Sequence, residues 1–242
     1  MPGPLDVAVV LLFAVAWPLL EHFYTWPHHV RAVDAGVPTA RTRAYQRTIL
    51  EQWTLTTLAA AALWFGGRSL ADVWLVVPDG WRLWLGAVLP VAYVVVVWVQ
   101  ARALFDSPRS LAKLRASLTP LRALIPHTRE EYAWFRPLAV TAGICEEFLF
   151  RGYLVWVLAA WIGVWAAAGV SMVIFGLAHS YQGRTFAVRA LLAGIGMGLL
   201  ALATGSVLPG MALHAGIDLA GGWITHRVLN APEVVVEPAA SE

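Results

Sequence analysis

Three ionisable side chains lie close together in the apolar stretch AGICEEFLFRG, residues 142–152. Charged groups inside an apolar span are costly and by default mark a functional site. Glu147 and Arg151 are four residues apart with the acid first, which is the favourable order for an ion pair on one helix face. Glu146 has no such partner. We therefore expect Glu147 to neutralise Arg151, and Glu146 to act as a general base that takes a proton from a reacting water.

Simpler interpretations of this stretch are also open. The three charges could form one buried salt-bridge network that only holds helices together. Cys145 could be a nucleophile, but an isolated Cys among apolar residues behaves as a small hydrophobic side chain, and no basic group lies near it in the sequence to form a thiolate. Glu51, near the start of an earlier apolar run, is assigned a structural role.

Two histidines follow in later apolar runs. In FGLAH, Phe175 and His179 are four residues apart, and in HAGID, His214 and Asp218 have the same spacing. Residues four apart share a helix face. An acid one turn from a histidine can accept the N–H of its ring and so fix its orientation. We therefore expect Asp218 to orient His214.

The depth of these residues can be compared by counting from the turns. If helices 133–159 and 163–180 are antiparallel, Glu146 and His179 lie about 16 and 17 residues from the turn near 161–163, so they share a depth. His214 is only about 8 residues from the turn near 205. Straight helices would place His214 towards the opposite side, so a tilt or a re-entrant segment is needed to bring it to Glu146.

The elements that position these residues are expected to be membrane helices. The chain of 242 residues is 59% hydrophobic and 13% charged, whereas soluble proteins are about 25% charged. Its apolar runs approach the roughly 20 residues needed to cross a bilayer, and 13 Trp fit the aromatic enrichment at membrane interfaces. These features predict an all-α polytopic bundle of about seven transmembrane helices. The runs lie near 5–23, 49–66, 82–105, 133–159, 163–180, 186–204 and 207–229.

Charge predicts orientation and excludes some partners. Net charge is only +2 and there is one Cys, so we expect neither a nucleic-acid partner nor an intramolecular disulfide. The basic residues concentrate in alternate connections, 24–48, 106–132 and 181–189, which the positive-inside rule places in the cytoplasm. The C-terminus is then cytoplasmic, in what we expect to be the cytoplasmic membrane of a prokaryote. Connection 106–132 has periodic Leu between cations, which is typical of an amphipathic surface helix.

Three segments follow from this pattern. Residues 1–119 hold the N-terminal transmembrane helices and the amphipathic cytoplasmic loop, with the first apolar run retained as a helix. Residues 120–229 hold the catalytic helical core, and 230–242 form a disordered tail.

The motifs EEFLFRG, FGLAH and HAGID, in this order, resemble those of the CPBP family of intramembrane proteases. The family is also called Abi and includes CAAX prenyl endopeptidases of the Rce1 type. The similarity covers about residues 120–229. It implies an endopeptidase that acts on a membrane-associated protein or peptide in contact with membrane lipid.

Site roles are also implied by the resemblance. Glu146 and His179 would hold and deprotonate the attacking water, and His214 would stabilise the oxyanion. Glu147 and Arg151 match the remaining motif positions. The last position, often Asn in the family, is Asp218 here; an ionised Asp cannot donate to an oxyanion, so it keeps its orienting role.

Other functions fit the same residues. The resemblance favours a glutamic mechanism without a cofactor, but Glu146, His179 and His214 could instead form a zinc site. Asp, Glu and His chains also relay protons in transporters, so a non-proteolytic proton-coupled transporter is one alternative. A catalytically silent immunity protein is another, because a fold does not imply a function.

Overall fold

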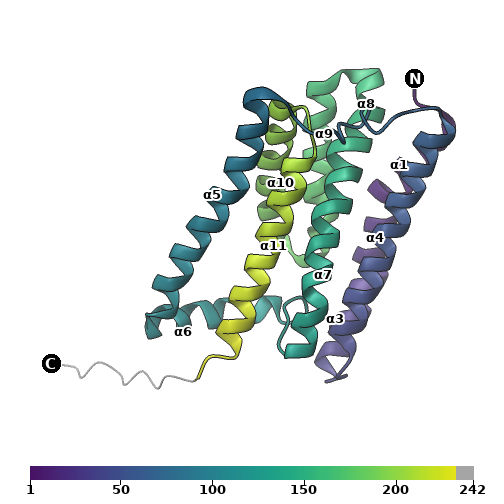
Figure 1. The fold of residues 1–242 in the computed structure, drawn as a ribbon. Helices are drawn as coiled ribbons and strands as arrows, with labels where there is room; N and C mark the ends of the chain where they lie inside the picture. Colours follow the sequence, from purple (N-terminus) through teal and green to yellow (C-terminus); the bar gives the residue numbers. More distant parts are fainter. Residues whose placement is uncertain (233–242) are drawn as a thin grey trace.

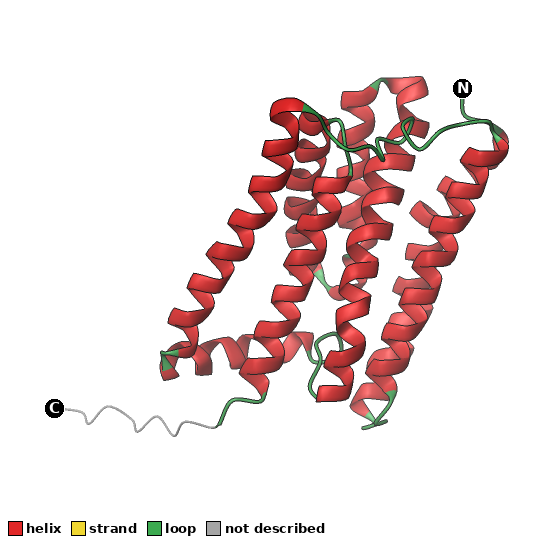
Figure 2. Ribbon diagram, viewed as in Figure 1, coloured by secondary structure: helices red, strands yellow, loops and turns green. Residues whose placement is uncertain are grey.

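The computed structural model describes residues 1–232, and every regular element in that range is a helix (Figure 2). The predicted all-α class is confirmed. Long helical rods run side by side, and one short helix lies across one end (Figure 1). Some rods are divided by turns of π-helix. The rods are α1–η1–α2–η2–α3 (Pro4–Asp34), α4 (Ala40–Phe65), α5 (Gly80–Phe105), α7–η4–α8 (Arg129–Glu146, Glu147–Leu154 and Val155–Ile162), α9 (Val164–Ala178), α10 (Arg184–Thr204) and α11 (Leu208–Leu229).

Four rods are long and apolar enough to cross a membrane: Pro4–Asp34, Gly80–Phe105, Val164–Gln182 and Arg184–Thr204. Only 6% of the most apolar window of α5 is buried inside the protein, as expected of a helix whose side chains face lipid rather than protein. The remaining rods are α4, α7–η4–α8 and α11, and both α4 and α11 pack on α7. The chain is an all-α membrane bundle.

The first connection is shorter than the sequence suggests. Segment 24–48 was expected to be a loop, but α3 continues to Asp34 and α4 begins at Ala40. Pro18 and Pro27 lie inside this rod, each at the second residue after a π-turn, Leu12–Ala16 or Glu21–Thr25. Such turns tolerate the missing proline N–H, because their hydrogen bonds skip one more residue.

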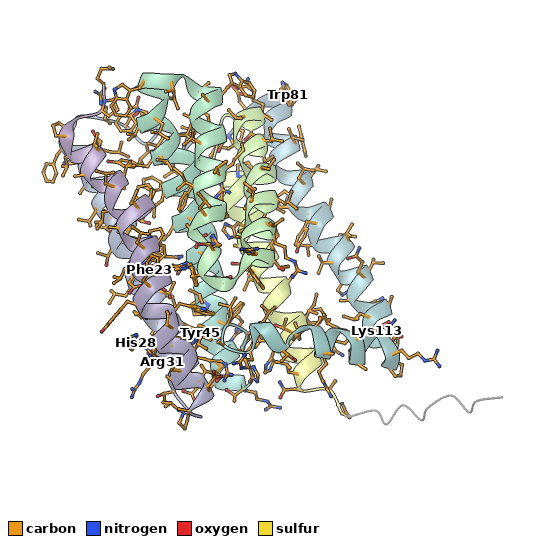
Figure 3. All side chains as sticks on the ribbon, turned by 180° about the vertical axis from the view of Figure 1, so that it is seen from behind. Phe23, His28, Arg31, Tyr45, Trp81 and Lys113 are labelled. Atoms are coloured by element: carbon orange, nitrogen blue, oxygen red, sulfur yellow. The ribbon has the colours of Figure 1, made fainter. Side chains whose placement is uncertain are left out.

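One end of the molecule carries the amphipathic helix. It is confined to α6 (Pro108–Ser117), shorter than the segment 106–132 in which it was predicted, and it lies across the ends of the rods (Figure 1). Lys113 on α6 and Arg31 on α3 lie at this end, whereas Trp81 lies at the other (Figure 3). The apolar side of α6 packs through Leu111 and Leu114 on a cluster around Val228 of α11. This end is called the α6 end below.

Counting residues from the two turns assumes that both turns lie at the same level in the bundle. In the structure, the turn before α11 lies at a different level from the Gly163 turn. The backbone N–H of Val207 donates to Trp74 O at 3.0 Å, and the Ser206 hydroxyl donates to Val76 O at 2.5 Å. The connection 66–79 therefore covers the α10–α11 turn. A Cβ at Gly152 would lie 2.8 Å from Val73 O and 3.8 Å from a methyl of Val207. The turn thus lies beside Gly152, well below the Gly163 turn.

Close packing of α7 on α11 continues from this point. A Cβ on Gly143 would lie 2.6 Å from the backbone nitrogen of Ala215, so only glycine allows this approach. With Gly152 beside Val207 and Gly143 beside Ala215, the helices run antiparallel and His214 comes level with Glu146. The straight-helix expectation for His214 is wrong, because the two turns are at different depths.

The predicted segments 1–119, 120–229 and 230–242 stay predictions. The helix α11 ends at Leu229, and the predicted tail, apart from 230–232, lies outside the described residues.

Candidate active site

A cavity of about 360 Å³ lies between α3, α4, α7, α9, α10 and α11. Its walls are mostly apolar, but Glu146, His179, His214 and Asp218 all line it. It extends to Ala123 and Leu124, in the connection that follows α6, and therefore reaches towards the α6 end. Four of the residues singled out in the sequence thus gather in one mostly apolar cavity.

The buried ion pair of Glu147 and Arg151 lies next to the cavity, in contact with the lining residues His214 and Phe175. Arg151 Nη1 donates to Glu147 Oε1 at 3.0 Å, and their side chains are 2% and 0% exposed. The Arg151 guanidinium also lies over the Phe175 ring, 4.0 Å from its centroid. The pair forms across one turn of η4, as the four-residue spacing predicts. A burial this complete is tolerated because each charge has its counter-charge.

The same glutamate holds a histidine. His214 Nδ1 lies 2.9 Å from Glu147 Oε1, so its N–H donates to that oxygen. Asp218 faces the other ring nitrogen, with Oδ2 3.7 Å from Nε2, which is beyond hydrogen-bond distance. The hydrogen-bond acceptor of His214 in this structure is therefore Glu147 and not Asp218, and the orienting role of Asp218 stays a prediction. The expected acceptor was the local one, whereas the acceptor present comes from another helix.

Glu146 faces the cavity with one oxygen held and the other without a hydrogen bond. Gln52 Nε2 donates to Glu146 Oε1 at 2.6 Å. Glu146 Oε2 lies 3.9 Å from His179 Nε2 and 3.9 Å from His214 Nε2. It is a buried atom with no hydrogen-bond partner among the described residues. Two imidazole nitrogens and one carboxylate oxygen therefore surround a small space.

The protonation of His179 follows from its neighbour. His179 Nδ1 lies 2.8 Å from the backbone oxygen of Phe175. A carbonyl oxygen only accepts, so Nδ1 carries a hydrogen, and in the neutral form of the ring Nε2 then presents a lone pair. Because His179 directly follows α9, its Nε2 can turn towards Glu146 Oε2. Of the three groups that face this space, Glu146 and, in its neutral form, His179 can accept a proton.

The π-helix η4 was not predicted, and it changes the arrangement of the glutamates. Its hydrogen bonds join residues five apart, so each turn holds one residue more than in an α-helix. Residues 148–154 of η4 are all buried. Glu146 and Glu147 consequently face the same imidazole, with Glu146 near its Nε2 and Glu147 on its Nδ1. An ordinary α-helix would turn adjacent side chains farther apart.

Two glycines leave room for the buried charges. A Cβ at Gly210 would lie 3.0 Å from Glu147 Oε2, and one at Gly194 would lie 3.0 Å from Arg151 Nη2. Both contacts are tighter than side chains normally allow, so α10 and α11 present small residues where the ion pair needs space.

Gln52 is the site residue that the sequence reasoning missed. A lone amide in the run EQWTL gave only the weak signal of a polar residue in an apolar segment. Its neighbour Glu51 lies 3.3 Å from Arg47 Nε and accepts from Trp17 at 3.4 Å, so Glu51 is part of a different contact. The structural role assigned to Glu51 is consistent with those contacts.

The three candidate zinc ligands, Glu146, His179 and His214, are farther apart in this structure than the ligands of a bound zinc ion. Ligand atoms about 2.0–2.1 Å from a tetrahedral zinc lie closer together than 3.9 Å, the distance that separates Glu146 Oε2 from each imidazole Nε2. Within residues 1–232, no group of three or more His, Cys, Asp or Glu side chains is placed to hold a metal. We derive no step through a metal.

Comparison with known proteins gives one family. Residues 128–220 match the family model described as "Type II CAAX prenyl endopeptidase Rce1-like". The matched range contains Glu146, Glu147, Arg151, His179, His214 and Asp218, but not Gln52. No curated protein and no solved structure matches this chain.

Proposed function

Because the helical core of this chain, residues 128–220, belongs to the Rce1-like family of type II CAAX prenyl endopeptidases, we propose that the protein is an intramembrane endopeptidase in which Glu146 activates the attacking water. The observation that carries the proposal is the convergence of Glu146 Oε2 with the Nε2 atoms of His179 and His214, each 3.9 Å away. A water can lie about 2.8 Å from these atoms, within ordinary hydrogen-bond distance.

The first step is attack by that water. Its two O–H groups donate to Glu146 Oε2 and His179 Nε2, which orients an oxygen lone pair towards the substrate carbonyl. As the oxygen bonds to the carbonyl carbon, one proton moves to Glu146 and the carbonyl electrons move onto its oxygen. General-base assistance of this kind contributes about 10²–10⁴-fold to a rate.

The developing oxyanion needs a donor that is already in place. His214 is held by its Nδ1–H bond to Glu147 at 2.9 Å, and in the imidazolium form its Nε2–H points into the cavity. Carboxylates of Glu146, Glu147 and Asp218 surround this ring and stabilise its positive charge. Preorganised donors in a site with little water are among the strongest contributions to catalysis.

Collapse of the tetrahedral intermediate completes the reaction. The protonated Glu146 returns its proton to the leaving nitrogen, the C–N bond breaks, and an amine and a carboxylic acid result. Arg151 takes no part in proton transfer and keeps Glu147 charged, so that Glu147 holds His214.

The substrate enters from the α6 end in this proposal, because the cavity extends to Ala123 and Leu124. Cations lie near this end, including Arg31, Arg41, Lys113 and Arg115. By the positive-inside rule, we propose that it faces the cytoplasm, together with the C-terminal end of α11.

Cleavage is tested with purified protein in detergent and a quenched peptide that ends in a farnesylated Cys-aliphatic-aliphatic-X sequence, the substrate type in the family's description. We expect wild type to cleave and Glu146→Gln to be inactive while folded. If the peptide is not cleaved, membrane proteomes of cells with either form are compared for an accumulating precursor. Absence of any precursor would reject the protease function. Cleavage in detergent would reject the transporter alternative, because transport needs a sealed membrane.

A second experiment tests whether the activity depends on a metal ion. Activity that survives chelators, with no zinc in the purified protein, is the expected result for the glutamic mechanism. Loss of activity on chelation and its return with zinc would support the zinc alternative through Glu146, His179 and His214.

A further inference from the structure

The shortest contact at the site joins the base to a helix outside the matched family segment. Gln52 on α4 donates its Nε2–H to Glu146 Oε1 at 2.6 Å. The two residues are 2% and 8% exposed, so the bond is buried. Within residues 1–232, Gln52 is the one side chain that forms a hydrogen bond with Glu146.

We propose that Gln52 is a positioning residue for the general base: its bond to Oε1 fixes the carboxylate so that Oε2 faces His179 and His214. The inference rests on the proposed function of Glu146. A carboxylate group is planar, so fixing the direction of one oxygen through its hydrogen bond also fixes that of the other. Without Gln52, Glu146 could rotate and lose its alignment with the two imidazoles.

The chemistry of the partner distinguishes the two adjacent glutamates. Glu147 is bonded to a guanidinium, which neutralises it. Glu146 is bonded to an amide, which donates a hydrogen bond but carries no charge. An Arg or Lys at position 52 would hold the carboxylate equally well but would form an ion pair with the base and weaken it as a proton acceptor. A neutral donor orients the base and leaves it reactive.

The backbone around Gln52 is itself well anchored. The next residue, Trp53, donates its indole N–H to Thr141 Oγ1 of α7 at 3.2 Å, and α4 packs along α7. The amide is therefore presented from a fixed position on the opposite wall of the cavity. Trp53 also provides a matched control, because its bond joins the same two helices but does not touch Glu146, His179 or His214.

The test compares Gln52→Met with Trp53→Phe. Methionine keeps the unbranched shape of glutamine and cannot donate, and Gln52→Leu serves as a second variant without a donor. We expect kcat for the farnesylated peptide to fall about 100-fold in both Gln52 variants, the scale that follows misplacement of a reacting group by about 1 Å, with KM little changed. Trp53→Phe should keep kcat within about 3-fold, although both changes lower the thermal midpoint. Equal kcat losses in Gln52→Met and Trp53→Phe would overturn the proposal, since they would show only a helix contact.

A measurement that does not depend on substrate cleavage tests this inference separately from the proposed function. The infrared carboxyl band of Glu146 is defined by subtracting the spectrum of Glu146→Gln from that of wild type. Gln52→Met should shift this band, and Trp53→Phe should not. If wild type proves to have no protease activity, the shift still supports the Gln52–Glu146 bond. An unshifted band would overturn the inference whatever the activity.

Discussion

Replacing Glu147 with Gln separates the roles of the two adjacent glutamates. The change keeps the size of the side chain but removes the charge that balances Arg151. The Arg151 side chain is 2% exposed and Glu147 is fully buried, so the guanidinium cannot move to water. His214 loses the charged acceptor of its Nδ1–H at the same time.

The size of the effect follows from that burial. Removing one partner of a buried ion pair costs about 3–5 kcal/mol, because the other charge stays buried without compensation. For a protein of this length, about 1 kcal/mol corresponds to 2–4 °C in the melting temperature. The Glu147→Gln variant should therefore melt about 6–20 °C lower than wild type.

Glu146→Gln gives the matched comparison. The variant amide oxygen still accepts from Gln52, and no cation is left without a partner. Its melting temperature should stay within about 4 °C of wild type, equivalent to about 1 kcal/mol. The melting temperatures of both variants are measured by Trp fluorescence during heating in detergent, and the amount of each variant in membranes is a second readout.

A double variant tests the reason for the loss. Adding Arg151→Met to Glu147→Gln removes the guanidinium charge that Glu147→Gln leaves unpaired and fills its space with an apolar side chain. Replacing a buried ion pair with side chains of similar volume in this way is often neutral or stabilising. We expect most of the lost stability to return but no activity, because His214 stays without its charged acceptor. Equal melting temperatures for Glu146→Gln and Glu147→Gln, or no recovery in the double variant, would refute this account of the ion pair.

Two further predictions concern space and orientation. Gly210→Ala places a methyl 3.0 Å from Glu147 Oε2 and should lower both stability and kcat. Gly221→Ala, on the same helix with nothing within 4 Å, should leave kcat unchanged and should not lower stability, because alanine favours a helix more than glycine does; equal losses in the two variants would contradict the space argument. For orientation, a membrane-impermeant maleimide should label Lys113→Cys only from the cytoplasmic side and Trp81→Cys only from outside, with little background from buried Cys145. The reverse pattern would invert the topology.

Local patterns in the sequence predict the helices and part of the site. The apolar runs correspond to the long rods, and four-residue spacing corresponds to the Glu147–Arg151 pair. Counting from the Gly163 turn correctly predicts that Glu146 and His179 approach each other. These predictions succeed because the rise per residue is constant along a helix, so residue counts give distances within one helix or one hairpin.

Contacts between distant segments account for what the sequence did not predict. His214 reaches Glu146 because the connection 66–79 covers the start of α11, and no local pattern contains that contact. The choice of Glu147 rather than Asp218 as the acceptor for His214 depends on the register of α7 against α11. Gln52 comes from a helix 94 residues earlier in the chain, where a single amide has no distinguishing neighbours.

The central claim is that Glu146 is the base and that Glu147 is not interchangeable with it. The most direct measurement is the cleavage rate of the farnesylated peptide by folded Glu146→Gln, purified in the same detergent as wild type. The account predicts a melting temperature within about 4 °C of wild type and no cleavage above background. Cleavage at the wild-type rate by that folded variant would contradict it.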